Sequence, residues 1–145
     1  MSYILRTRAS LPGQQISNGD LFYYDSSRSK TLSVSRQTVV FGRKGNTDNA
    51  YLEFSDGNTT GAPMIQNGTI TKIASIASSG NTTKSFELYL NGVLSHSFSF
   101  PGTLSYENST VNVDFNQGDE MRILVTSTGS GITDPKIILE TAWRV

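Results

Sequence analysis

The chain has 145 residues, of which 36% are hydrophobic, while Ser, Thr, Asn and Gly together make up about 41%. This length suits one domain, and the composition favours β-strands joined by many turns over helical bundles or doubly wound α/β folds. The net charge is zero, cysteine is absent and no apolar run approaches the roughly 18 residues of a membrane-spanning helix. We therefore expect no disulfide, no thiolate metal site and no membrane partner.

Strand-like runs bounded by Gly, Asn, Asp or Pro recur along the whole chain. They cover residues 3–8, 21–24, 31–41, 51–54, 69–77, 84–90, 93–100, 111–115, 120–126 and 136–143. The runs predict about eight to ten strands and no significant helix, which is an all-β fold in a single antiparallel β-sandwich. We expect residues 1–18 to form an N-terminal arm or first strand, and residues 19–145 to form the sandwich domain.

The run 69–77 carries Ile70, Ile73 and Ile76, a spacing that also fits one face of a helix. Thr, Ser and Ile are weak helix formers, and a Gly-Asn pair follows the run, so we predict a strand. A β-bulge within this strand would explain the spacing of the isoleucines.

The clearest turn signal is Asn91-Gly92, because both central positions of a type I′ hairpin turn need positive φ, which Asn tolerates and Gly adopts freely. The two-residue loop predicts three cross-strand pairs, which are Leu90 with Val93, Leu88 with Ser95, and Glu87 with His96. Side chains alternate along each strand, so both faces of the hairpin are substantially apolar. One face carries Phe86, Leu88, Leu90 and Val93.

The second face of this hairpin needs a cover, because a monomer rarely leaves a large contiguous apolar patch in water. A loop of the same chain is one candidate. The chain is short and offers few such loops, so we predict that sister copies cover this face and that the protein is a homo-oligomer. The candidate interface residues are Glu87, Tyr89, Leu94, His96, Phe98 and Phe100.

Positive charge is concentrated in the first third of the chain. Residues 1–44 carry seven positive and two negative charges, whereas residues 45–145 carry five positive and ten negative charges. Such a split either steers one surface onto an acidic neighbour or reflects chance clustering on a solvated surface. A nucleic-acid partner is not expected, because no clear aromatic platform is interleaved with the basic residues. The candidate docking residues are Arg6, Arg8, Arg28, Lys30, Arg36, Arg43 and Lys44.

Candidates for catalysis are few. His96 is the only histidine, and a position opposite Glu87 would suit a general base, although such a pair in a sheet is more often a simple cross-strand contact. Asp114 and Asp119 flank a turn and are candidates for binding Ca²⁺, but no calcium-loop motif surrounds them. We therefore expect no enzymatic activity, no catalytic residue, no metal and no cofactor.

A glycan is a further candidate partner, because sugar sites on β-sandwiches use exposed aromatic rings with Asn, Asp and Gln nearby. Packing in the core or in an interface is the alternative role for these rings, especially for Trp143, which follows the apolar run 137–139. The candidate rings are Tyr23, Tyr24, Tyr51, Tyr106 and Trp143.

Residues 111–123, with the sequence VNVDFNQGDEMRI, cover about a tenth of the chain and resemble a late strand–turn–strand of trimeric jelly rolls in the complement and tumour-necrosis-factor superfamily. The whole chain is similar to small virion proteins of tailed bacteriophages, which are rich in Ser, Thr, Asn and Gly, free of Cys and all-β. The runs RKGNT at 43–47, NGTI at 67–70 and LETAWR at 139–144 add to this similarity. The resemblance implies a jelly-roll sandwich and a homotrimer.

These features together predict a non-enzymatic virion structural protein, a homotrimeric capsid decoration (cement) protein that stabilises a phage head. Its partners would be its own copies and the major capsid protein or another virion protein, with assembly in the host cytoplasm. The alternative is a phage tail-fibre or knob domain that binds host surface glycans.

Overall fold

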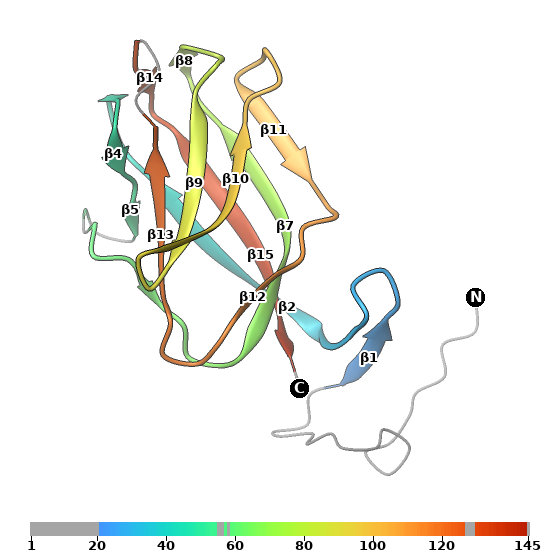
Figure 1. Ribbon diagram of the computed structural model, residues 1–145. Helices are drawn as coiled ribbons and strands as arrows, with labels where there is room; N and C mark the ends of the chain where they lie inside the picture. The colour runs from blue at the N-terminus through green and yellow to red at the C-terminus, as the bar shows by residue number, and fades with distance from the viewer. Residues whose placement is uncertain (1–20, 55–56, 58, 127–129, 145) are drawn as a thin grey trace.

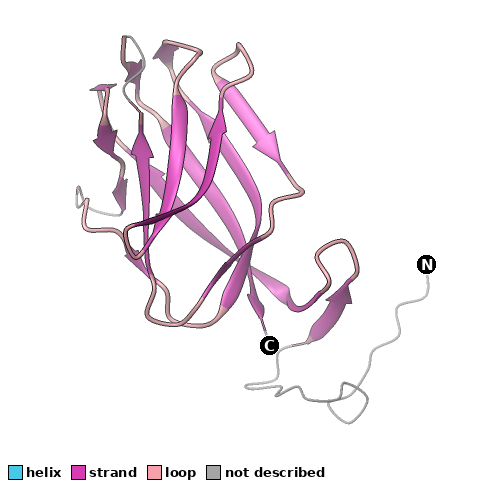
Figure 2. Cartoon of the chain, in the orientation of Figure 1, coloured by secondary structure: helices cyan, strands magenta, loops and turns pink. Residues whose placement is uncertain are grey.

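A computed structural model describes residues 21–54, 57, 59–126 and 130–144, and these residues form strands and no helix (Figure 1, Figure 2). Nine strands have three or more residues, which agrees with the expected number, and six are two-residue pairs. The strands are β1 (Phe22–Asp25), β2 (Lys30–Gly42), β3 (Asn46–Thr47), β4 (Ala50–Tyr51), β5 (Glu53–Phe54), β6 (Ala62–Pro63), β7 (Gly68–Ile76), β8 (Ser79–Gly80), β9 (Ser85–Leu90), β10 (Val93–Ser99), β11 (Ser105–Asn108), β12 (Val113–Phe115), β13 (Glu120–Val125), β14 (Ile132–Thr133) and β15 (Lys136–Arg144). Within these ranges no helix is long and apolar enough to cross a membrane.

Two antiparallel sheets pack face to face, which confirms the predicted all-β sandwich (Figure 1). The seven-stranded sheet has the order β1-β2-β15-β7-β11, with β12 also paired to β7 and β5 to β2. The five-stranded sheet has the order β10-β9-β13-β4, with β6 also paired to β13. A three-stranded sheet of β3, β14 and β8 lies at one end of the sandwich.

The strands pair in a nested order along the chain. β2 pairs with β15, β4 and β6 pair with β13, β7 pairs with β11 and β12, and β9 pairs with β10. The outermost strands of this nest are thus neighbours in space. β15 lies between β2 and β7, in the middle of the larger sheet.

The predicted bulge in β7 is present. Glu140 of β15 pairs with Lys72, and the next residue of β15 pairs with Ile70, so Thr71 is the extra residue. This insertion lets Ile70 and Ile73 both point into the core, although they are three residues apart. Strict alternation beyond Ile73 then turns Ile76 toward solvent.

The predicted type I′ turn between β9 and β10 is also confirmed. Asn91 and Gly92 both have positive φ, 52° and 77°, and Val93 pairs with Leu90 across the two-residue loop. The predicted strand 51–54 is instead split between the two sheets. Its first part pairs with β13 and its last part with β2, and the buried Leu52 lies at the crossing.

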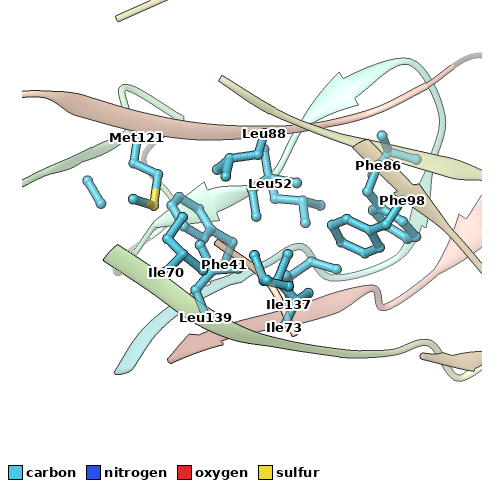
Figure 3. Close-up of a cluster of buried hydrophobic side chains, with 14 of the residues drawn as sticks. Phe41, Leu52, Ile70, Ile73, Phe86, Leu88, Phe98, Met121, Ile137 and Leu139 are labelled. Atoms are coloured by element: carbon cyan, nitrogen blue, oxygen red, sulfur yellow. The ribbon is translucent and has the colours of Figure 1, made fainter. Parts of the chain in front are cut away.

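The core lies between the two sheets (Figure 3). Its side chains come from β2, β7 and β15 on one side and from β9, β10 and β13 on the other. The labelled core residues are Phe41, Leu52, Ile70, Ile73, Phe86, Leu88, Phe98, Met121, Ile137 and Leu139.

Lys84 is buried completely just before β9, at the end of this core. Its ammonium group forms an ion pair with Asp48 and donates a hydrogen bond of 2.9 Å to the carbonyl oxygen of Thr126. Asp48 itself remains partly exposed. These contacts join the segment between β3 and β4 to the start of β9 and the end of β13.

The hairpin of β1 and the start of β2 projects from the sandwich (Figure 1). The pairing of β2 with β15 is interrupted between Leu32 and Arg36. There the Ser33 hydroxyl accepts a hydrogen bond from the Trp143 backbone N–H at 2.9 Å and donates one to the Ser35 carbonyl at 2.8 Å. The predicted arm at residues 1–18 lies outside the described residues.

Candidate functional site

The hairpin of β9 and β10 departs from its predicted register beyond Leu94. His96 pairs with Leu88 instead of Glu87, because Ser95 is an extra residue that forms a β-bulge in β10. One extra residue in a strand moves every later side chain to the opposite face of the sheet. The predicted second face of this hairpin is therefore wrong from His96 onward.

The bulge turns Phe98 and Phe100 into the core, where their exposed fractions are 7% and 4%. Phe98 stacks on Phe86 of β9 and on Tyr106 of β11, with ring centroids 5.1 and 5.0 Å apart, and Phe100 meets Phe86 edge-on at 5.1 Å. Figure 3 shows Phe86 and Phe98 side by side at one end of the core. The assignment of Phe98 and Phe100 to an intersubunit face is thus corrected, because their own chain covers them.

Three of the candidate interface residues, Glu87, Tyr89 and Leu94, do lie on the outer face of the five-stranded sheet. The Tyr89 hydroxyl donates a 2.5 Å hydrogen bond to Glu87 Oε2, and this bond raises the pKa of Tyr89. Its ring meets Tyr51 edge-on at 6.2 Å, and the Arg122 guanidinium lies 5.6 Å over the Tyr51 ring. Leu94 is 51% exposed. This face is a mixed polar and aromatic surface, not the apolar patch that alternation predicted.

His96 points inward beside Phe98, with ring centroids 6.4 Å apart. Its Nε2 atom is buried and has no hydrogen-bond partner among the described residues. Burial lowers the pKa of His96. Because Glu87 bonds to Tyr89 instead, the Glu87–His96 pair considered for general-base chemistry does not form.

Protonation of His96 is expected to destabilise the fold. Its folded-state pKa lies below the value of about 6.5 in the unfolded chain, so its contribution is fully present above that pH and is lost as the pH falls toward the folded-state pKa. Urea unfolding from about pH 7.5 to 5 should show a falling free energy of unfolding in the wild type and a smaller fall in His96→Gln. Equal pH dependence in the two proteins would contradict the assignment.

Those predicted docking residues that the structure describes do not form one surface. Arg6 and Arg8 lie outside the described residues. The side chain of Arg28 is only 12% exposed and pins the projecting hairpin to the sandwich, so its assignment to a docking surface is corrected. It donates hydrogen bonds of 2.7–2.8 Å to the Asp25 carboxylate and to the carbonyl oxygens of Thr71, Ser109 and Val111.

Lys30 and Arg36 also have acidic partners within the chain. Lys30 forms a 2.7 Å ion pair with Asp114, and Arg36 lies 3.4 Å from Glu140 and donates a 2.7 Å hydrogen bond to the Tyr23 hydroxyl. The charges of these two residues are already compensated. Arg43 and Lys44 remain as the docking candidates without such a pair in the described part of the chain.

Asp114 and Asp119, the calcium candidates, are both occupied by protein donors. Besides Lys30, Asp114 Oδ1 accepts a hydrogen bond from the Thr69 hydroxyl at 2.6 Å. Asp119 accepts hydrogen bonds of 2.7 Å from the Asn91 amide and from the Asn116 backbone N–H. Across the described residues, no three His, Asp or Glu side chains gather in a way that could hold a metal ion.

The candidate sugar-binding rings divide into two groups. Tyr51, Tyr106 and Trp143 are half-buried, and Tyr106 and Trp143 pack against the core. Tyr23 and Tyr24 are exposed on the projecting hairpin. Only the last two therefore present rings to solvent in the way that a sugar platform requires.

The outer face of the seven-stranded sheet carries an apolar surface that the sequence analysis missed. Val40, Ile138 and Ala74 are neighbours across β2, β15 and β7, and Ile76 lies two residues beyond Ala74 on the same face of β7. Val40, Ile138 and Ile76 are 44%, 39% and 57% exposed. We call these four residues the outer row. The available signal was the continuous apolar runs 39–41 and 137–139, which are typical of strands that are apolar on both faces.

Two ion pairs lie beside the outer row, whereas Lys136, which pairs with Ile76 across the sheet, forms no ion pair among the described residues. Arg36 pairs with Glu140, and Lys72 forms a 2.5 Å ion pair with Glu107. Glu140 also accepts a 2.9 Å hydrogen bond from the Thr71 hydroxyl. Burying these ion pairs in an interface would therefore not leave either of their charges without a partner.

No family model matches this sequence, and no curated protein is similar enough to match it. The surfaces described above are therefore the basis for inferring what the protein does.

Proposed function

We propose that the chain is a non-enzymatic virion structural protein, a homotrimer that decorates and stabilises a phage head, and that its copies meet on the outer row. The observation that carries this proposal is the exposure of Val40, Ile138 and Ile76 in adjacent strands of the larger sheet. A contiguous exposed apolar surface is typical of a site of protein association. Neighbouring copies would remove these side chains from water.

The nested strand pairing supports a jelly roll as the form of this sandwich. A jelly roll folds an antiparallel ribbon into two sheets, so strands early in the chain pair with strands late in the chain. The pairs β2–β15, β4–β13, β7–β12 and β9–β10 follow this order. The proposed number of subunits, three, is based on the resemblance to trimeric jelly rolls.

The oligomer is tested by placing an acid in the outer row. In sedimentation velocity at micromolar concentration, we expect the wild type to have three times the mass of one chain and Ile138→Asp to be monomeric. The charge introduced there would have to be desolvated in the interface. Ile76→Asp, at a more exposed position, is the second variant and should also dissociate the trimer. Circular dichroism should show unchanged β-structure in both.

Leu94→Asp is the matched control, because it places the same charge at an exposed apolar residue of the other sheet. It should leave the trimer intact. A monomeric wild type would refute the oligomer. Dissociation by Leu94→Asp but not by the outer-row variants would move the interface to the five-stranded sheet.

Labelling of intact phage particles with an antibody against the chain tests the location. We expect the label on the head. Label on the tail would favour the alternative, a fibre or knob domain that binds host glycans. The observation in favour of that alternative is the exposure of Tyr23 and Tyr24 on the projecting hairpin. Glycan-array binding that is lost in Tyr24→Ala would support it.

A further inference from the structure

Three cations that form no ion pair within the described part of the chain gather at the end of β2. The described residues include ten lysines and arginines, and seven of them form ion pairs within the chain. The other three are Arg43, Lys44 and Lys136. All three line a single hollow of about 370 Å³, together with Gly42, Asp134 and Pro135.

A second hollow of about 530 Å³ adjoins the first, because Gly42, Arg43 and Lys44 line both. Its other lining residues are Thr38, Val40, Glu53 and Phe54. The two hollows form one groove with cations along it and an apolar part at Val40 and Phe54. We call it the β2 groove.

The β2 groove carries three positive charges, on Arg43, Lys44 and Lys136, and two negative charges, on Glu53 and Asp134, so its net charge is positive. Arg43 Nη1 donates to the carbonyl oxygen of Tyr51 at 3.3 Å, which orients the guanidinium group. Asp134 lies near Lys44, but its carboxylate accepts hydrogen bonds from the Gly45 backbone N–H at 2.6 Å and from the Ser78 hydroxyl at 3.0 Å. The bond from Gly45 is the main reason why the pKa of Asp134 is lowered. This acid thus holds the loop that carries the cations.

The groove adjoins an open edge of the larger sheet at Thr38 and Val40. β1 pairs with β2 as far as Ser33, and β5 pairs with it from Phe41. From Ser35 to Val40, no strand of the described part pairs with the edge of β2 that faces away from β15. An open edge offers backbone N–H and C=O groups to an extended segment of another chain.

The other side of this edge carries an apolar slot of about 200 Å³. Val39 of β2 lines it together with Phe54, Met64, Ile65 and Trp143. A strand added to β2 would direct alternate side chains to opposite faces of the sheet. One set would reach the cationic groove, and the other set would reach the apolar slot.

We propose that the open edge of β2 binds, by β-strand addition, an extended segment of a partner protein in which acidic and apolar residues alternate. Carboxylates would pair with Arg43 and Lys44, and apolar side chains would enter the slot beside Val39. The chain's own predicted strand 3–8 carries two arginines and is a poor electrostatic match. This inference sharpens the docking part of the proposed function by naming the chemistry of the partner.

The experiment measures fluorescence anisotropy with a short fluorescein-labelled peptide of alternating glutamate and valine. We expect saturable binding to the full chain that weakens as salt is added. Arg43→Gln/Lys44→Gln should weaken binding about tenfold, because two partly desolvated charge pairs are lost. A peptide of alternating glutamate and serine should also bind more weakly, because it leaves the slot empty.

Lys72→Gln/Arg122→Gln removes the same charge elsewhere and should leave the affinity within about twofold. If Arg43→Gln disturbs the fold, the double variant Lys44→Gln/Lys136→Gln is used in place of Arg43→Gln/Lys44→Gln, because the side chains of Lys44 and Lys136 are both exposed. Absence of saturable peptide binding would overturn the proposal. Equal weakening of peptide binding by the groove variant and by Lys72→Gln/Arg122→Gln would also overturn it. Stronger competition by polyphosphate or single-stranded DNA than by unlabelled peptide would also overturn it. The peptide assay needs no capsid, and the tested residues Arg43 and Lys44 lie outside the outer row, so this result and the oligomer test fail independently.

Discussion

Replacing Phe98 by alanine is expected to lower the free energy of unfolding by about 4 kcal/mol. Deleting a large buried aromatic side chain removes its transfer free energy and leaves a cavity in a close-packed core. Phe98 stacks on one ring from each sheet, Phe86 and Tyr106, so its loss weakens the packing between the sheets. Urea unfolding followed by circular dichroism should show a lower midpoint.

Leu94→Ala is the control, because Leu94 lies on the same strand but faces solvent. Its effect should stay within about 0.5 kcal/mol, as is usual for exposed positions. If Phe98→Ala kept the stability of the wild type but changed the oligomeric mass, the ring would belong to an intersubunit contact, and the inward orientation of this strand segment would be wrong.

Asp48→Ala is expected to destabilise the fold by about 3 kcal/mol, because it leaves the buried ammonium group of Lys84 without its acid. The partial exposure of Asp48 places the effect at the lower end of the range for buried pairs. Lys84→Met should be less harmful, because it keeps most of the packing of the side chain and removes the buried charge. Guanidinium unfolding of the two variants gives the comparison.

Glu120→Ala serves as the control for this pair, because it breaks the partly exposed ion pair with Arg122 on the five-stranded sheet, away from the outer row. Its effect should be below about 1 kcal/mol. A larger loss of stability in Lys84→Met than in Asp48→Ala would mean that Lys84 stabilises the fold mainly through its other contacts, which include the hydrogen bond to Thr126, and not through the ion pair.

Local signals in the sequence predicted the local structure well. The Asn91-Gly92 turn follows from the positive φ angles that a type I′ turn needs. The bulge at Thr71 follows from isoleucines whose spacing does not fit a regular strand. The bulge at Ser95 gave no such signal, because Leu94, His96 and Phe98 alternate regularly with serines. Burial of Phe98 against Tyr106 selects the bulge, and that contact depends on the tertiary fold.

The same distinction applies to the surfaces. Residues 1–44 do carry an excess of positive charge. Which of these side chains lack an ion pair, however, depends on acidic residues far along the chain. Lys30 finds Asp114, whereas Lys136, from the acidic part of the chain, lies with Arg43 and Lys44. Strand β11 (Ser105–Asn108) was missed because its residues are mostly polar and show no apolar alternation. Its place follows from pairing with β7.

The central position of β15 has a consequence for how the chain folds. Val39 pairs with Leu139, so β2 has no neighbour along most of its length until nearly the whole sequence has been made. Contacts between such distant segments make folding slow, because a long loop must close before any stabilisation is gained. We therefore expect the apolar side chains of β2 to stay exposed until β15 is available to pair with them, and apolar strands exposed in this way promote aggregation.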